Sequence, residues 1–405
     1  MTSMTKSTYN ENLSTHTADM PEPDNDALGY SRRLRDRIRN EIEISGGEIS
    51  FRRYMEMALY EPGLGYYSGG ARKFGKDGDF TTAPEMSPLY SRCIARQCKE
   101  ILDNTGGGVI LELGAGTGVM AATVLEELNR LQHLPDKYLI LETSADLRQR
   151  QQQLLAAEHP RYLDNIQWLD YLPSEPIRGA ILASEVLDAL PVRRIEFSDQ
   201  GIRELCVSVQ GGEFVTVGSV PDKGVSVFAG KLQKYFSAEY TGTYTTEINP
   251  ELEAWIASFA DTLIQGVMLI VDYGYPRKEY YHPQRTAGTL KCHYRHRVHD
   301  DPFLYPGLQD ITAALDFTGV AEAAVDSGLD VLGYTTQAHF LAACGLGEML
   351  SEAQHDDFHF LQLSQQAKLL TLPGEMGEQF KVMALGQNYG SQLRGFGIQD
   401  MRSRL

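Results

Sequence analysis

The stretch VILELGAGTG, residues 109–118, decides the fold of this 405-residue chain. Its apolar start predicts a short strand that is buried on both faces. Three glycines follow at alternate positions: Gly114, Gly116 and Gly118. Residues 119–131 then carry apolar side chains at helical spacing. A strand, a glycine loop and a helix in this order predict the nucleotide-binding turn of a doubly wound α/β sheet, where backbone approaches a ligand closely.

The spacing of the glycines indicates which nucleotide is bound. A dinucleotide turn needs G-x-G-x-x-G, but the sixth position counted from Gly114 is Val119, which disfavours an NAD-dependent oxidoreductase. The order is instead E-x-G-x-G-x-G, which resembles motif I of class I S-adenosylmethionine (SAM) methyltransferases. Glu112 suits a cationic ammonium group. Glu142, at the end of the next apolar run, lies where such folds hold a ribose diol, although a plain surface acid is the alternative there.

SAM is therefore the expected cofactor. The residues expected to bind it lie in the glycine loop and after the neighbouring strands: Glu112, Gly114, Ala115, Gly116, Gly118, Glu142 and Asp170. For Asp170, a contact with adenine and a simple loop acid are equally compatible with the sequence.

Composition narrows the class of protein. Hydrophobic residues make up 42% and charged residues 22%, which is ordinary for a globular protein. The net charge of -17 argues against a nucleic acid partner. Five scattered cysteines predict reduced thiols, and no apolar run is long enough to span a membrane. The first 27 residues lack the features of a signal or transit peptide, so a disordered tail and a cytoplasmic location are expected.

The remaining apolar runs complete a sheet. Short strands are expected at residues 138–141, 166–169, 180–183, 267–271, 329–334 and 380–385. Seven strands with the last one antiparallel form the sheet of class I methyltransferases. The expected organisation is a tail (1–27), an N-terminal helical or lid segment (28–105), the first half of the SAM-binding domain (106–192), a β-containing insertion (193–265), and the second half (266–400) with a substrate-facing insertion at 275–328.

Carboxylates follow the expected fourth and fifth strands. Glu185 and Asp188 come after the fourth strand and Asp272 after the fifth, so all three are expected at the ligand crevice as catalytic residues. An arginine guanidinium is always charged, and carboxylates are suited to orient it and to stabilise its charge during methylation. On spacing alone, ordinary surface carboxylates are an equally good interpretation.

Further polar side chains are expected to contact the substrate. They come from the segments on either side of the cofactor strands: Asp79, Thr82, Glu85, His293, Arg295, Asp310 and Asp316. No metal site is expected, because Cys292, His293, His296 and His299 lack a matched second pair of ligands. A hydrolase is unsupported, since no G-x-S-x-G elbow is present.

Together these motifs resemble the MidA-like SAM-dependent methyltransferases, a family that includes the mitochondrial complex I assembly-factor arginine methyltransferase. The matching pieces include EPGLGYY, GDFTTAPEMSPL, LELGAGTG, SEVLDALPV, LIVDYGY and YYHPQRTAGTLKCHYRHR. The resemblance implies a class I fold and a substrate cleft built by the N-terminal segment and the insertions. The sequence departs from the family pattern at Ser184, where Asn is usual, and before Asp316, where the usual His is missing.

The resemblance implies methylation of a protein, with arginine as the favoured acceptor. The alternative is a SAM-binding assembly or chaperone-like protein with little or no catalytic activity. A homodimer is left open, and neither nucleic acid nor a membrane is an expected partner.

Overall fold

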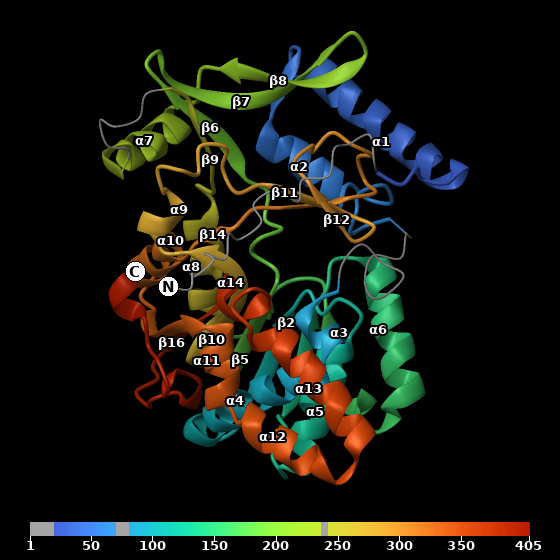
Figure 1. Ribbon diagram of the computed structural model, residues 1–405, viewed down its shortest axis with the longest axis vertical. Helices are drawn as coiled ribbons and strands as arrows, with labels where there is room; N and C mark the ends of the chain where they lie inside the picture. The colour runs from blue at the N-terminus through green and yellow to red at the C-terminus, as the bar shows by residue number, and fades with distance from the viewer. Residues whose placement is uncertain (1–19, 70–80, 236–241) are drawn as a thin grey trace, which may run out of the picture.

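The computed structural model describes residues 20–69, 81–235 and 242–405. Figure 1 shows a large α/β layer in the lower half of the view and a second layer of antiparallel strands and helices above it. Residues 1–19 and 70–80, which include most of the expected tail and the glycine-rich segment before Thr81, lie outside the described residues. Helix α1 (Asn25–Ile44) begins slightly earlier than expected, because the Asp24 carboxylate caps it by accepting from Ala27 N.

The lower layer is built on the expected sheet. Its strands, in spatial order, are β15 (Asp330–Thr336), β16 (Phe380–Gln387), β10 (Leu263–Tyr275), β5 (Ile177–Ser184), β2 (Val109–Leu113), β3 (Lys137–Leu141) and β4 (Ile166–Leu169). Only β16 among these runs antiparallel to its neighbours. The seven-stranded prediction is confirmed, and a two-residue strand, β14 (Leu315–Asp316), adds to β10.

Alternate residues of the central strands feed two apolar cores. On β10, Val267, Leu269 and Val271 belong to one core, whereas Met268 and Ile270 belong to the other. This period of two is what a strand covered on both faces requires. The first core packs against α4 (Pro88–Thr105), α5 (Val119–Arg130), α6 (Ala145–Glu158), α11 (Gln337–Ala343), α12 (Leu346–Glu352) and α13 (Asp357–Thr371). The second packs against α8 (Leu252–Thr262) and α10 (Phe317–Asp326).

The upper layer, called the roof below, combines distant parts of the chain. Its antiparallel sheet contains β1 (Glu48–Ser50), β6 (Arg193–Ser198), β7 (Gly201–Gln210), β8 (Glu213–Ser219) and β9 (Tyr244–Ile248). Strand β1 of the N-terminal segment pairs with β7 of the insertion, so the two segments share one sheet. Helices α1 and α2 (Phe51–Tyr60) and a small sheet of β11 (Lys291–Tyr294), β12 (Arg297–His299) and β13 (Asp310–Thr312) complete the roof.

Both faces of helix α1 contact the rest of the roof. Leu34, Ile38 and Ile42 are buried on its apolar face. On its arginine face, Arg35 pairs with Glu213 of β8, so the arginine-rich segment serves structure. Three shorter helices are α3 (Ala83–Met86), α9 (Arg277–Tyr280) and α14 (Met376–Gln379), and α7 (Lys223–Leu232) covers the end of the roof sheet. Within the described ranges, no helix has the length and apolarity needed to cross a membrane.

Candidate active site

A cavity of about 1030 Å³ lies between the carboxyl ends of the central strands and the roof. Its walls come from the glycine loop, the ends of β3, β5 and β10, the N-terminal segment around Tyr67, and strands β11 and β13. In doubly wound sheets, ligands bind outside the carboxyl ends of the strands, where neighbouring loops separate. The position of the cavity therefore agrees with the expected ligand crevice.

The glycine loop forms one wall. Gly114, Gly116 and Gly118 have φ angles of 59°, 54° and 89°, a left-handed conformation that favours glycine. Gly114, Ala115 and Gly116 line the cavity, whereas Gly118 caps the start of α5 and does not line it. A Cβ atom added at Gly116 would meet no atom within 4 Å. The loop therefore leaves open space where a ligand can approach its backbone.

Glu112 is the penultimate residue of β2, just before this loop. Its side chain is 1% exposed, and its Oε2 accepts a hydrogen bond of 2.6 Å from the Tyr138 hydroxyl. Burial raises the pKa of Glu112 to about 7, although the bond from Tyr138 acts in the opposite direction. A cationic ligand group beside it would stabilise the ionised form of this buried carboxylate.

Glu142 follows β3 and is held by a residue that the sequence did not single out. Its Oε1 accepts from Ser144 N at 2.9 Å, and its Oε2 accepts from Gln151 Nε2 at 3.0 Å. The same Nε2 donates to the Gly116 carbonyl at 3.0 Å, and Gln151 Oε1 accepts from Trp168 Nε1 at 3.0 Å. Gln151 thus ties the glycine loop to Glu142. Its helical position on α6 gave no local signal for this role.

Glu185 has an unusual backbone conformation. It directly follows β5, with a φ of 55° that residues other than glycine rarely adopt. Its Oε1 accepts from Ala83 N, at the start of α3, at 3.2 Å. Burial raises the pKa of Glu185 to about 7, and the negative charges of Glu85 and Asp310 add to this. The carboxylate therefore contacts the N-terminal segment at the cavity wall.

Asp188 and Asp272 form a buried acid pair. Asp272 accepts from Leu187 N at 3.0 Å and from Asp188 N at 3.1 Å, both through Oδ2. Burial raises the pKa of Asp188 to about 8, with Glu185 as the next cause, and the pKa of Asp272 is raised in the same way. Asp188 lines the cavity but Asp272 does not. Asp272 therefore lies behind Asp188 and holds its backbone.

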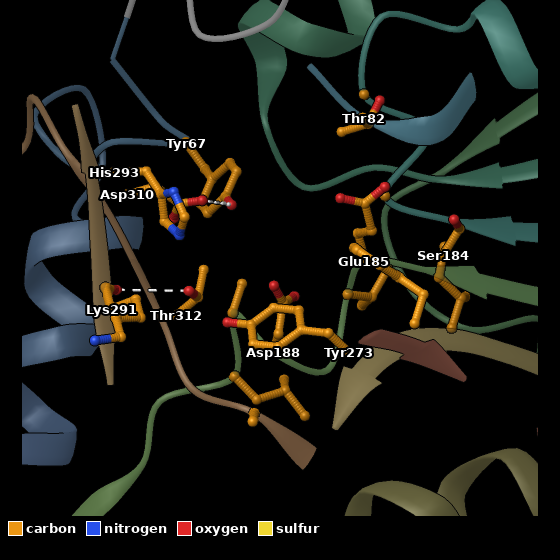
Figure 2. Close-up of a pocket in the computed structure, with 18 of the residues that line it drawn as sticks. Tyr67, Thr82, Ser184, Glu185, Asp188, Tyr273, Lys291, His293, Asp310 and Thr312 are labelled. Carbon is orange, nitrogen blue, oxygen red and sulfur yellow. Dashed lines mark hydrogen bonds between the residues drawn. The ribbon is translucent and has the colours of Figure 1, made fainter. Parts of the chain in front are cut away.

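The roof supplies the opposite wall (Figure 2). The Tyr67 hydroxyl donates to Asp310 Oδ2 at 3.0 Å, and the Tyr67 ring stacks on Tyr60. His293 of β11 also lines the cavity, and burial lowers its pKa to about 4, so its ring is neutral at pH 7. Figure 2 shows Tyr67, His293 and Asp310 on one side of the space and Glu185 with Thr82 on the other.

The structure gathers some of the expected site residues and separates others. Eleven of them line the cavity: Thr82, Glu85, Glu112, Gly114, Ala115, Gly116, Glu142, Glu185, Asp188, His293 and Asp310. Asp79 lies outside the described residues.

Besides Gly118 and Asp272, three further expected residues do not line the cavity. The Asp170 side chain is 72% exposed and pairs with Arg148 at 2.8 Å. Arg295 lies in the exposed turn between β11 and β12. Asp316 pairs with Arg277 at 2.8 Å and lines a separate cavity of about 620 Å³. In each case a charged side chain near a strand end points away from the crevice. The spacing of residues in the sequence does not predict that direction.

Two aromatic residues were missed because their partners are distant in sequence. Tyr273 lines the cavity beside the acids, and burial raises the pKa of its hydroxyl. The Tyr90 hydroxyl lies 2.8 Å from the Ser184 hydroxyl. Ser184, the position that departs from the family pattern, is therefore engaged with α4.

Comparison with known proteins agrees with this architecture. The family model of S-adenosyl-L-methionine-dependent methyltransferases matches residues 93–335, more than half of the chain. A crystal structure of a Burkholderia thailandensis protein bound to S-adenosyl-homocysteine is 42% identical, covers 96% of this chain and 100% of that one, and superposes with a TM-score of 0.91.

Curated relatives are more distant in sequence. Protein arginine methyltransferase NDUFAF7, mitochondrial, from Danio rerio is 28% identical over 84% of this chain and 84% of its own. The Homo sapiens protein of the same name is 26% identical over 84% of this chain and 80% of its own.

The expectation of a cytoplasmic location is overturned by these relatives, which are named as mitochondrial proteins. The absence of a recognisable targeting signal in the first residues was a poor basis for that prediction. The family match, the overall superposition and the cavity over the glycine loop agree with one another, and the chain belongs to the SAM-dependent methyltransferases.

Proposed function

We propose that this enzyme transfers the methyl group of SAM to the guanidinium of an arginine in a protein substrate. The observation that carries the proposal is the acid wall, defined as Glu185, Asp188 and Asp310 around one cavity with Asp272 behind them. Such a cluster of buried acids favours a cationic ligand. The curated relatives are named protein arginine methyltransferases, which supports the same substrate class.

The opposite end of the cavity suits the cofactor. We assign the ammonium group of SAM to the neighbourhood of Glu112 and its ribose to Glu142, with the backbone of Gly114 and Gly116 between them. The buried Glu112 carboxylate and the open space at Gly116 fit such a ligand. When bound, SAM supplies an electrophilic methyl group on a sulfonium centre.

The acid wall then has two tasks. Glu185 and Asp188 hold and orient the guanidinium so that one nitrogen faces the methyl group, which is mainly an effect of positioning and water exclusion. A nitrogen–carbon bond forms as the sulfur–carbon bond breaks, and the methylated nitrogen must release one proton. Asp188, with a pKa raised to about 8, is suited to accept that proton near neutral pH.

The test uses the purified full chain, SAM labelled in its methyl group, and two peptides that differ only in having Arg or Lys at one position. We expect label in the Arg peptide and methylarginine after acid hydrolysis. The Asp188→Asn variant should lose transfer, whereas Asp170→Asn, which removes an exposed carboxylate outside the cavity, should keep it. Label in neither peptide, or equally in both, would refute the assignment of arginine.

A further inference from the structure

Among the residues that the structure describes, one cation lines this acid-rich cavity without a carboxylate partner. Arg285 lies in the loop between α9 and β11 and lines the cavity. Its guanidinium carbon lies 4.2 Å from the centroid of the Tyr275 ring. Within the described part of the chain, its buried Nε has no hydrogen-bond partner and no carboxylate oxygen lies within 4.0 Å of the guanidinium. By contrast, Arg277, only eight residues earlier, is paired with Asp316 and Glu322.

The loop that carries Arg285 is firmly anchored. Thr289 donates to Glu247 Oε2 from its backbone nitrogen at 2.6 Å and from its hydroxyl at 3.0 Å. Thr245 N donates to the Thr286 carbonyl at 2.8 Å. A Cβ atom at Gly288 would approach Glu247 Oε1 to 2.4 Å, so the loop packs directly against β9. The position of Arg285 is thus fixed by its surroundings and by the ring of Tyr275.

Arg285 lies on the acceptor side of the cavity. Tyr275 ends β10, only two and three residues beyond Tyr273 and Asp272. The glycine loop follows β2, which is separated from β10 by β5, a lateral distance of about 10 Å at ordinary strand spacing. A second cation, Lys381 Nζ, lies 5.8 Å from the same Tyr275 ring. Among the described residues, Arg285 and Lys381 therefore place two cationic side chains around Tyr275, on the β10 side of the sheet.

We propose that Arg285 determines substrate specificity by binding a carboxylate of the methyl-accepting polypeptide close to the target arginine. A guanidinium is charged at every physiological pH and offers a planar fork that matches a carboxylate with two parallel hydrogen bonds. Burying part of it without an anion is costly, so an acidic group that arrives with the substrate is stabilised there. This inference rests on the proposed function, because it needs a polypeptide acceptor in the same cavity.

The experiment measures binding separately from transfer. Arginine peptides of equal length carry Asp at one position within three residues of the arginine, and their partners carry Asn at that position. Binding to the full-length protein saturated with S-adenosyl-homocysteine is measured by calorimetry. We expect at least one Asp peptide to bind about tenfold more tightly than its Asn partner, as a charge-assisted bidentate pair allows. Arg285→Gln should abolish that difference, and Arg285→Lys should restore only part of it.

The control is Lys278→Gln, which removes the same charge from an exposed residue outside the cavity and should keep the Asp preference. The inference is overturned if wild-type protein binds every Asp and Asn pair equally. It is also overturned if Arg285→Gln weakens binding of S-adenosyl-homocysteine about tenfold or more, because the anion would then belong to the cofactor. Methyl transfer to the same peptides is scored in parallel: no transfer refutes the proposed function, while the binding comparison still decides the role of Arg285.

Discussion

The two ends of the cavity differ in the groups that surround their buried carboxylates. At the glycine loop, both oxygens of Glu142 accept from Ser144 and Gln151, and Glu112 accepts from Tyr138. At the acid wall, Asp188 lies against Asp272 and Glu185, and like charges raise each pKa further. The first end is a finished hydrogen-bond network. The second brings several carboxylates together, so that their charges oppose one another's ionisation.

This difference separates the residues expected to bind the cofactor from those expected to act in methyl transfer. A satisfied network is rigid and defines the shape of a ligand site before the ligand arrives. A cluster of carboxylates with raised pKa values opposes folding when ionised and is stabilised when a cation binds. Residues of the first kind should therefore govern cofactor affinity. Residues of the second kind should govern transfer, and removing one of them should not cost stability.

The largest expected effect tests the glycine-loop end. Gly116→Val should abolish detectable binding of SAM and of S-adenosyl-homocysteine, because a branched side chain fills the open space at a φ of 54°. Calorimetric titration measures this. The matched control is Gly211→Val, at a φ of 58° in the turn between β7 and β8, where a Cβ atom also meets nothing within 4 Å. Unchanged affinity in Gly116→Val would exclude the loop from the cofactor site.

The next largest effect tests the acid wall. Asp188→Asn should lower the transfer rate by about 100-fold, as expected when a group that stabilises developing charge is lost. Its affinity for S-adenosyl-homocysteine should stay close to that of the wild type. Its melting temperature at pH 8 should be equal or higher, since a buried charge is removed. A clear drop in melting temperature would show that Asp188 is a structural residue.

The pH dependence of methyl transfer also tests the acid wall. Glu185 and Asp188 have pKa values of about 7 and 8, so both are largely protonated at pH 6 and ionised at pH 9. Transfer at saturating SAM should therefore rise between these pH values. Because both pKa values are raised in the folded state, the protonated groups favour folding at low pH, and this contribution is lost as the pH rises to about 7 and 8. A flat rate profile would contradict the role of these carboxylates, and thermal unfolding across the range checks the second statement.

The smallest expected effect concerns the roof. Tyr67→Phe removes one hydrogen bond to Asp310 and should raise the KM for the acceptor about threefold to tenfold, with cofactor affinity retained. Tyr60→Phe is the comparison variant, because the Tyr60 hydroxyl donates to the Ala189 carbonyl at 2.9 Å, a backbone acceptor and not a carboxylate. A larger loss of cofactor affinity than of acceptor affinity in Tyr67→Phe would place Tyr67 in the cofactor site.

The central sheet could be predicted from the sequence because its signals are local. Most of its strands contain short apolar runs, and β2, β3, β4, β5 and β10 each lead into an acid or a glycine loop. The same reasoning located Glu112, Glu142, Glu185 and Asp188 at the crevice.

The rest of the site depends on contacts between distant segments. Tyr67 meets Asp310 across 243 positions, and Tyr90 meets Ser184 across 94. Arg285 and Arg277 are alike in local sequence character, yet only Arg277 is paired with acids. Position at the end of a strand does not predict whether a charged side chain points toward the crevice, as Asp170 and Asp316 show.

The pairing of β1 with β7 also constrains the order of events during synthesis. Ile49 pairs with Val207, so the first strand of the roof waits for about 160 further residues before its partner exists. At a translation rate of roughly 5–20 residues per second, that interval is on the order of 10 to 30 s. During it, the unpaired edge of β1 and the apolar face of α2 have no native cover from β7. The N-terminal segment therefore completes its native sheet only after β7 of the insertion has been synthesised.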